Sequence, residues 1–175
     1  MPARVVLLNG PAGVGKTTVG RALAATVPNG ACIHGDCFKR FIVSRVEGTV
    51  AGGLGYTNGA TVAASFVEAG YDLVIFAYVF ERRANVDHFL ATFGPPVPVH
   101  LFTLWAPLHV IMERERTRPD RKRLGRRVAA CYRAIEQDLD QLGYRIENVD
   151  APPHDVAREI YHLCTQDLGV VNRQR

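Results

Sequence analysis

The feature of the sequence that most constrains its fold is a glycine-rich segment near the amino terminus, GPAGVGKT at residues 10–17. The residues before it, ARVVLL at 3–8, form a short apolar run typical of a strand buried on both faces. The residues after it, from Lys16 to about Val27, predict a helix that the sequence PNG ends. A strand, a glycine-rich turn and a helix in this order are typical of the start of an α/β domain.

The same segment fits the pattern G-x-x-x-x-G-K-[ST], the Walker A motif or P-loop. Its glycines let successive backbone N–H groups face a phosphate, and the following helix adds its positive end. Lys16 is expected to reach the β- and γ-phosphates, Thr17 to offer its hydroxyl to Mg²⁺, and Thr18 to contact the α-phosphate. A glycine-rich turn without nucleotide is the weaker alternative. The predicted nucleotide-binding residues here are Gly10, Pro11, Ala12, Gly13, Val14, Gly15, Lys16, Thr17 and Thr18.

Strand-like and helix-like segments alternate along the rest of the chain. Further strands are expected at 31–34, 72–80, 97–105 and 144–150. Helices are expected at 36–46, 60–70, 83–93, 107–118, in a stretch ending near 142, and at 152–169. The glycine-rich residues 47–59 are expected to form a mobile loop. This alternation predicts an α/β fold, a parallel sheet with helices on both faces, within a single domain spanning 1–175.

Composition narrows the function classes only a little. The formal charge of +4 favours anionic partners such as nucleotides and is too small to indicate nucleic acid by itself. The four cysteines match neither a zinc site nor a redox pair, which favours free thiols in a reducing cytoplasm. No signal peptide is recognised, and no apolar run approaches the roughly 18 residues of a membrane span. A cytoplasmic protein without a membrane partner is therefore expected.

One carboxylate that P-loop proteins often use is missing from its usual place. Many of them hold Mg²⁺ with an aspartate that ends a neighbouring apolar strand. The most apolar strand here, 72–80, has Asp72 at the wrong end and Glu81 only after its last residue, so Glu81 is a late candidate. Asp36 follows the second strand, where it can activate an attacking hydroxyl and hold a Mg²⁺-bound water. The alternative is that Asp36 only caps a helix.

A strongly basic segment surrounds the sequence RTRPDRKRLGRR. Positions 112–127 hold eight basic and three acidic residues, so their net charge exceeds that of the whole protein. Because a proline and a glycine interrupt two helices there, the segment predicts a lid at about 114–127 that closes over phosphates and excludes water. Arg118 and Arg121 flank the break and are predicted to point inward.

Other candidates near the predicted site have structural alternatives. The basic segment could be a solvated pair of helices with ion pairs such as Glu113 with Arg116. Tyr78 could offer its hydroxyl to a substrate or pack in the core. Arg82 and Arg83 could meet an anionic substrate or lie on the surface at a helix start.

A P-loop, an aspartate after the second strand and an arginine-rich lid together resemble the small P-loop kinases, the group of shikimate, gluconate and adenylylsulfate kinases. The likeness is greatest to chloramphenicol phosphotransferase-like proteins. It is carried by LLNGPAGVGKTT at 7–18, HGDCF at 34–38, VEAG at 67–70, VF at 79–80, RPDR at 118–121 and VD at 149–150. It implies a five-stranded parallel sheet and a general base at Asp36, and it suggests an adenine-binding loop at 149–154 that contains Pro153. A substrate loop is expected at 47–59, although these residues share little with the family beyond glycines.

One departure from that family concerns magnesium. The family carries aspartates just before the VF sequence, where this chain has Ala77 and Tyr78. Its way of holding Mg²⁺ through this strand, and its substrate, are therefore not carried over.

These observations favour an ATP-dependent, Mg²⁺-requiring phosphotransferase that acts on a hydroxyl of a small molecule. An antibiotic, a sugar acid and a nucleoside are all open as acceptors. A polynucleotide 5′-hydroxyl kinase is an alternative, although no basic groove interleaved with aromatic residues is evident. A third hypothesis is a regulatory protein that binds ATP without transferring phosphate. The oligomeric state is not indicated.

Overall fold

The computed structural model describes residues 2–44, 53–117 and 125–172. Five strands form one sheet in which every neighbouring pair is parallel, in the order β2-β3-β1-β4-β5. The strands are β1 (Arg4–Asn9), β2 (Gly30–His34), β3 (Leu73–Ala77), β4 (Val99–Trp105) and β5 (Tyr144–Glu147). The expected five-stranded parallel α/β fold is thus confirmed.

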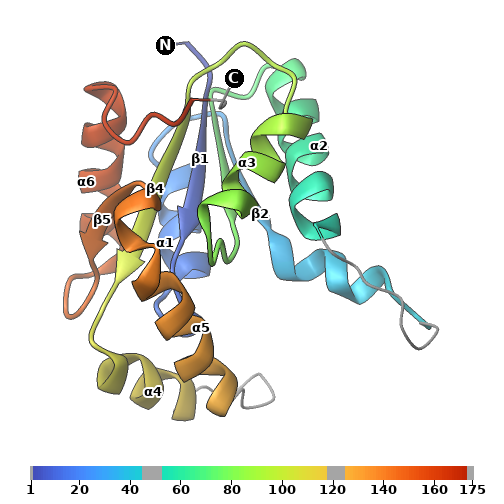
Figure 1. Cartoon of the computed structure of the whole chain (residues 1–175). Coiled ribbons are helices and arrows are strands. Elements are labelled where there is room, and N and C mark those ends of the chain that lie inside the picture. Colours follow the sequence, from blue (N-terminus) through green and yellow to red (C-terminus); the bar gives the residue numbers. More distant parts are fainter. Residues whose placement is uncertain (1, 45–52, 118–124, 173–175) are drawn as a thin grey trace.

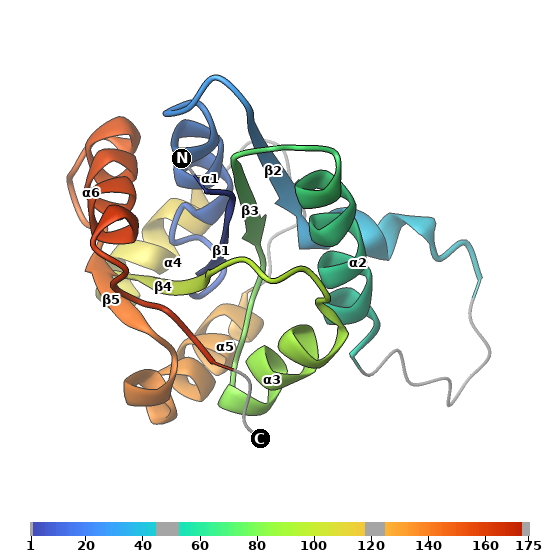
Figure 2. The ribbon, with the colours of Figure 1, turned by 90° about the horizontal axis from the view of Figure 1, so that it is seen from above.

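The central strands explain why the sheet has two covered faces. Every residue of β3 and β4 is buried, as their continuous apolar sequences require, whereas β5 at one edge is largely exposed. Two helices, α1 (Lys16–Ala24) and α6 (Pro153–Thr165), pack together on one face. Two others, α2 (Leu54–Glu68) and α3 (Arg83–Thr92), pack together on the opposite face (Figure 2).

The remaining helices lie towards the carboxyl ends of the strands. Helices α4 (Leu108–Arg116) and α5 (Arg126–Gln137) pack against each other beyond the ends of β1 and β4 (Figure 1). A short 3₁₀-helix, η2 (Leu139–Gln141), leads from α5 towards β5.

Among the described helices, none has both the length and the apolar character needed to cross a membrane.

The segment after β2 differs from the expected helix at 36–46. It forms a 3₁₀-helix, η1 (Gly35–Phe41), that projects away from the sheet (Figure 1). Phe38 packs towards Phe76, but Phe41 is 77% exposed and Val43 is 97% exposed. Without an apolar face to bury, the segment has little packing energy to stabilise a longer α-helix.

Helix α2 begins at Leu54, so the predicted loop at 47–59 is wrong for its described end. Residues 47–52 lie outside the described part of the chain. Gly55 and Gly59 lie inside this helix and face aromatic rings. A Cβ on Gly59 would lie 2.3 Å from Cζ of Phe76, and a Cβ on Gly55 would lie 2.7 Å from Oη of Tyr78. These glycines therefore serve close packing against β3, although glycine usually weakens a helix.

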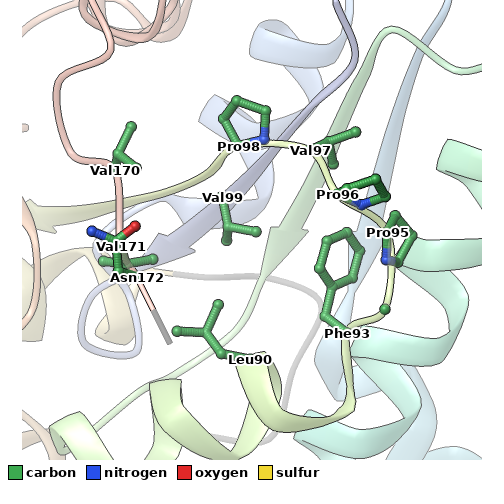
Figure 3. A pocket seen from close by; sticks show the side chains of 11 residues that line it. Leu90, Phe93, Pro95, Pro96, Val97, Pro98, Val99, Val170, Val171 and Asn172 are labelled. Carbon is green, nitrogen blue, oxygen red and sulfur yellow. The ribbon is translucent and has the colours of Figure 1, made fainter. Parts of the chain in front are cut away.

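A cavity of about 310 Å³ lies at the amino-terminal end of the sheet (Figure 3). It is bounded by the end of α3, the proline-rich turn before β4 and the carboxyl-terminal residues Val170, Val171 and Asn172. Ligands of open parallel sheets bind at the carboxyl ends of the strands. This cavity is therefore not the site that the sequence motifs indicate.

Candidate active site

The P-loop connects β1 to α1 at the carboxyl end of the central strand. Gly10 has φ of 136°, and a Cβ there would lie 2.5 Å from the carbonyl oxygen of Leu104. Only glycine allows that backbone conformation so close to β4. Gly15, also at positive φ, precedes α1, whose first backbone N–H groups point back towards the loop and can bind an anion.

Lys16 folds back across the loop that precedes it. Its Nζ donates to the carbonyl oxygens of Gly10 at 2.6 Å and Pro11 at 3.0 Å. The ammonium is thus held at the loop, where it can exchange these carbonyls for phosphate oxygens. Thr17 is half-buried and Thr18 is exposed in the first turn of α1.

The loop is supported from the β5 side by residues that the sequence analysis did not single out. The buried Asn148 donates from Nδ2 to the carbonyl oxygen of Val14 at 2.6 Å. Arg114, on α4, donates to the carbonyl oxygens of Asn148 at 2.8 Å and of Val149. Helix α4 and the end of β5 therefore shape the P-loop from outside.

The predicted adenine-binding loop begins at this support. Its first residue, Val149, is held by Arg114, and its residue Pro153 is exposed as the first residue of α6. Adenine binding at Pro153 stays a prediction.

Asp36 lies in the first turn of η1, directly after β2. Since β3 lies between β2 and β1, Asp36 is two strands away from the P-loop strand, at the same edge of the sheet. The N-cap position of η1 belongs to His34, so the simple capping hypothesis for Asp36 is wrong. Asp36 Oδ1 accepts a hydrogen bond from Lys39 Nζ at 2.9 Å, and both side chains are more than half exposed.

Lys39 connects Asp36 to Tyr78. Its Nζ lies 5.4 Å from the centre of the Tyr78 ring. Burial lowers the pKa of Lys39, but Asp36 and Tyr78 more than offset this, so the pKa is raised and the side chain stays charged. Tyr78 packs against the backbone of Gly35, where a Cβ would lie 2.2 Å from Cδ2 of the ring. Tyr78 thus occupies the position after β3 where the family that this chain resembles has an aspartate.

Asn9, at the end of β1, is fully buried, and its side chain connects two other segments of the chain; the sequence analysis did not single it out. Its Oδ1 accepts from the Phe80 backbone N–H at 2.8 Å, and its Nδ2 donates to Thr103 Oγ1 at 3.1 Å. It therefore joins the segment after β3 to β4, immediately before the P-loop. The signal available in the sequence was a polar residue that directly follows the apolar run VVLL.

Helix α5 brings a thiol to the P-loop. Burial raises the pKa of the Cys131 thiol, the Ala12 backbone N–H and the Lys16 ammonium lower it, and Glu81 raises it. The thiol is therefore near the P-loop and within electrostatic range of Glu81, the late carboxylate candidate. All four cysteines, each within the described residues, are free, as expected.

The predicted inward-pointing arginines of the lid, Arg118 and Arg121, lie outside the described residues. Two arginines that flank this segment have other partners. Arg114 holds the end of β5, and Arg116 forms an exposed pair with Glu113 at 2.8 Å, the surface pair weighed as an alternative. Such exposed pairs add little to stability.

The two arginines after β3 belong to the start of α3. The Arg82 backbone N–H donates to Asn85 Oδ1 at 3.0 Å in a capping arrangement. Arg83 pairs with Asp87 at 2.8 Å and donates to the Asn172 carbonyl oxygen. For Arg83, the surface alternative is therefore the one observed.

The residues present suit Mg²⁺ bound together with a nucleotide rather than in a preformed cage. Among the described residues, no group of three or more histidine, cysteine, aspartate or glutamate side chains converges on one point. Mg²⁺ typically takes one or two carboxylates together with phosphate oxygens and water. The Thr17 hydroxyl at the start of α1 is an oxygen ligand suited to such a site, and Asp36 and Glu81 are carboxylates at the same edge of the sheet.

Comparison with known proteins places the fold. No protein-family model matches the sequence, and no curated protein sequence matches it significantly. Among solved structures, the Deinococcus radiodurans tunicamycin resistance protein superposes with a TM-score of 0.66 at 20% identity, covering 97% of this chain and 99% of that one. Shikimate kinase from Acinetobacter baumannii, in complex with shikimate, gives 0.60 at 22% identity and 95% coverage of both chains.

A gluconokinase from Sinorhizobium meliloti gives a TM-score of 0.62 at 16% identity, covering 95% of this chain and 94% of that one. These matches extend over nearly the full length of each protein. The chain therefore has the fold of the small P-loop kinases.

Proposed function

We propose that this protein is an ATP-dependent phosphotransferase that moves the γ-phosphate to a hydroxyl of a small molecule. The observation that carries the proposal is the placement of the P-loop and Asp36 on one edge of the sheet, with only β3 between their strands. That arrangement offers a phosphate cradle and a carboxylate base to two reactants that meet at this edge. The structural neighbours named for shikimate and gluconate phosphorylation support it.

In this proposal the acceptor oxygen attacks the γ-phosphorus, the bond to the β–γ bridging oxygen breaks, and ADP leaves. The hydroxyl proton passes to the Asp36 carboxylate. The P-loop N–H groups and Lys16 hold the phosphates, and Thr17 is a ligand of Mg²⁺. When bound with ATP, Mg²⁺ neutralises part of the phosphate charge. Because Lys39 contacts Asp36 Oδ1, the acceptor hydroxyl has to share this carboxylate with it or displace it.

Three further assignments belong to the proposal. Arg118 and Arg121 close over the phosphates as part of a lid, and Pro153 contacts the adenine. The acceptor is an antibiotic, a sugar acid or a nucleoside; the neighbours' names include a resistance protein and two sugar-related kinases.

The experiment is ADP release from Mg·ATP across a panel of hydroxyl acceptors, including an oligonucleotide with a free 5′-hydroxyl. Wild type is compared with two variants, Asp36→Asn and Asp72→Asn. Asp72 is the matched control because it precedes β3 and therefore lies at the opposite edge of the sheet from Asp36. We expect one acceptor to stimulate wild type and Asp72→Asn, while Asp36→Asn is about a hundredfold slower, the scale of a lost general base. Equal rates in wild type and Asp36→Asn would contradict the assigned base.

A second candidate is a regulatory protein that binds ATP without transferring phosphate. Ala77 and Tyr78, in place of strand-end carboxylates, favour it. It predicts tight Mg·ATP binding, no acceptor-dependent ADP release, and indifference to Asp36→Asn.

A further inference from the structure

We propose that Lys39 is a positioning residue for the transfer reaction: it holds the Asp36 carboxylate in place while its own ammonium contacts the Tyr78 ring. The acceptor hydroxyl then meets a base of fixed orientation and shares the carboxylate with Lys39 instead of displacing it. This deepens the proposed function and rests on it, because Lys39 acts through Asp36.

The 3₁₀ geometry of η1 brings the two side chains together. A 3₁₀-helix has three residues per turn, so side chains three positions apart lie on the same face, one above the other. Asp36 and Lys39 are such a pair, and Lys39 Nζ donates to Asp36 Oδ1 at 2.9 Å. This hydrogen bond restricts the rotation of the carboxylate, and a base that takes a proton from a positioned hydroxyl needs a defined orientation.

Lys39 also contacts an aromatic ring that is itself held in place. Its Nζ lies 5.4 Å from the centre of the Tyr78 ring, within the range of a cation–π interaction. The Tyr78 N–H donates to the Leu8 carbonyl oxygen at 3.2 Å, on the strand that leads into the P-loop. A Cβ on Gly35 would lie 2.2 Å from Cδ2 of this ring, and a Cβ on Gly55 would lie 2.7 Å from its Oη. The ring is therefore enclosed between the backbones of η1 and α2.

Neighbouring rings hold both Tyr78 and η1 against the sheet. The Tyr78 ring packs against Tyr56, with 5.4 Å between the ring centres, and against the fully buried Phe76 at 5.5 Å. Phe38 of η1 packs towards the same Phe76 ring, with 6.4 Å between the centres. A continuous series of contacts thus runs from Asp36 through Lys39 and Tyr78 to the P-loop strand.

Other basic residues in this region are less suited to this role. Lys16 Nζ is bonded to the carbonyl oxygens of the P-loop. Arg40 is exposed and stands four positions after Asp36, which places it on another face of the 3₁₀-helix. Because the pair of Lys39 with Asp36 is more than half exposed, it should add little to stability, and its effect is expected in turnover.

The first test is steady-state kinetics with the acceptor that the panel identifies. We expect Lys39→Met to lower kcat by about tenfold or more, the scale of a misplaced reacting group, without changing KM for Mg·ATP. Lys39→Arg should keep most of the wild-type kcat, because a guanidinium also binds a carboxylate and stacks on a ring. Arg40→Met, which removes an equal charge from the same helix, is the matched control and should match wild type.

A double substitution shows whether Lys39 acts through Asp36. In the Asp36→Asn background, Lys39→Met should cause no further loss of kcat, because the group that Lys39 positions is already gone. Two losses that multiply would mean that Lys39 acts on the phosphoryl group directly, and the inference would be wrong. Circular dichroism checks that each variant is folded.

The second test reads the arrangement without turnover. The ring current of Tyr78 should shift the NMR resonances of the Lys39 Cε protons upfield, and Tyr78→Leu should remove this shift. The chain has three lysines, so comparison with Lys39→Arg assigns the resonance. Unshifted Lys39 resonances in wild type would overturn the inference.

Failure of this inference can be told from failure of the proposed function. If Lys39→Met turns over as fast as wild type while Asp36→Asn does not, the role of Lys39 is overturned and the kinase proposal stands. If wild type transfers phosphate to no acceptor of the panel, both proposals fail.

Discussion

The Asn9 side chain accepts a hydrogen bond from the Phe80 backbone N–H at 2.8 Å, across the end of the sheet. The residue before the P-loop and the segment after β3 are thereby held as one unit. Asn9 also donates to Thr103 Oγ1, and both of these hydrogen bonds lie in the interior, where the loss of a bond is costly.

Replacing Asn9 should therefore harm both stability and the site. We expect Asn9→Ala to lower the free energy of unfolding by about 2 kcal/mol or more, because buried partners lose their bonds. Urea unfolding measures this. The control is Asn29→Ala, whose side chain makes one exposed bond to the Gly70 carbonyl oxygen. If the two substitutions cost the same, Asn9 has no special role.

Lys16 is the second test. Lys16→Ala removes the ammonium held at the P-loop, and we expect Mg·ATP affinity to fall by about a hundredfold or more, as for loss of a strong charged contact. Calorimetry gives the affinity directly. Arg158→Ala, which removes an equal charge from the surface of α6, should bind as wild type does. Normal affinity in Lys16→Ala would refute the phosphate-cradle assignment.

Gly59 tests the packing of α2. Helix propensity alone says that Gly59→Ala should stabilise the protein by up to about 1 kcal/mol. A Cβ there would lie 2.3 Å from the Phe76 ring, so we expect a net loss of about 1 kcal/mol or more from overpacking. Thermal unfolding decides the sign. Gly94→Ala, where a Cβ meets nothing within 4 Å, is the control and should leave the midpoint unchanged.

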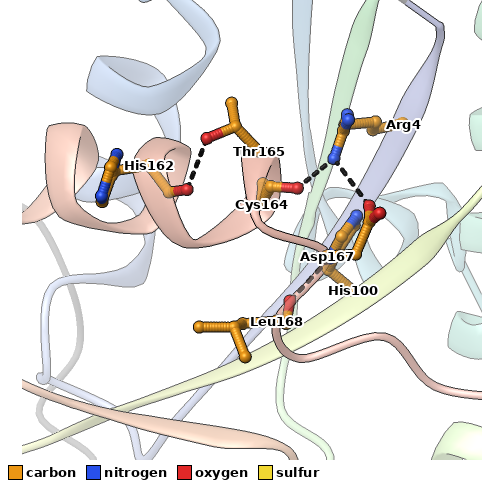
Figure 4. A network of polar contacts seen from close by, with 7 residues as sticks. All are labelled: Arg4, His100, His162, Cys164, Thr165, Asp167 and Leu168. Atoms are coloured by element: carbon orange, nitrogen blue, oxygen red, sulfur yellow. Dashed lines mark hydrogen bonds and ion pairs between the residues drawn. The ribbon is translucent and has the colours of Figure 1, made fainter.

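The buried His100 should make stability depend on pH. Its Nδ1 donates to the Leu168 carbonyl oxygen at 2.8 Å, and its buried Nε2 has no partner among the described residues (Figure 4). Burial lowers the pKa of His100 from 6.5; the Leu168 carbonyl opposes this, Arg4 adds to the lowering, and Asp167 opposes it. The unfolded chain therefore takes up the proton first as the pH falls.

It follows that the contribution of His100 to stability is complete above about pH 6.5 and is lost as the pH falls towards its lowered pKa in the folded state. We expect the unfolding free energy to drop between about pH 7.5 and about pH 5.5 by more in wild type than in His100→Phe. Urea titrations at both pH values measure it. His154→Phe, at an exposed histidine, serves as the control, and an equal drop in wild type and His100→Phe would exclude His100 as the source.

Some elements of the fold could be predicted from local sequence patterns, and others could not. The P-loop, its strand and its helix could be predicted because each depends on neighbours within a few residues. Residues 54–59 were expected to form a loop because glycine disfavours helices, but Gly55 and Gly59 are required by rings of Tyr78 and Phe76, which come from a distant strand. Where a helix was expected after β2, the chain forms the 3₁₀-helix η1, because Phe38 alone packs towards the core while Phe41, Ile42 and Val43 stay exposed.

The sequence by itself determined the glycine-rich P-loop between β1 and α1, the alternation that makes a parallel sheet, and Asp36 as a carboxylate at a strand end. Glycine spacing, apolar periodicity and strand direction are local properties, so they can be read without knowing which segments meet. Only the tertiary structure decided that β3 lies between β1 and β2, that Asn9 holds Phe80, and that Asn148 donates to the Val14 carbonyl oxygen of the P-loop. Strand order and side-chain partners depend on contacts between residues far apart in the chain, and no local pattern specifies them.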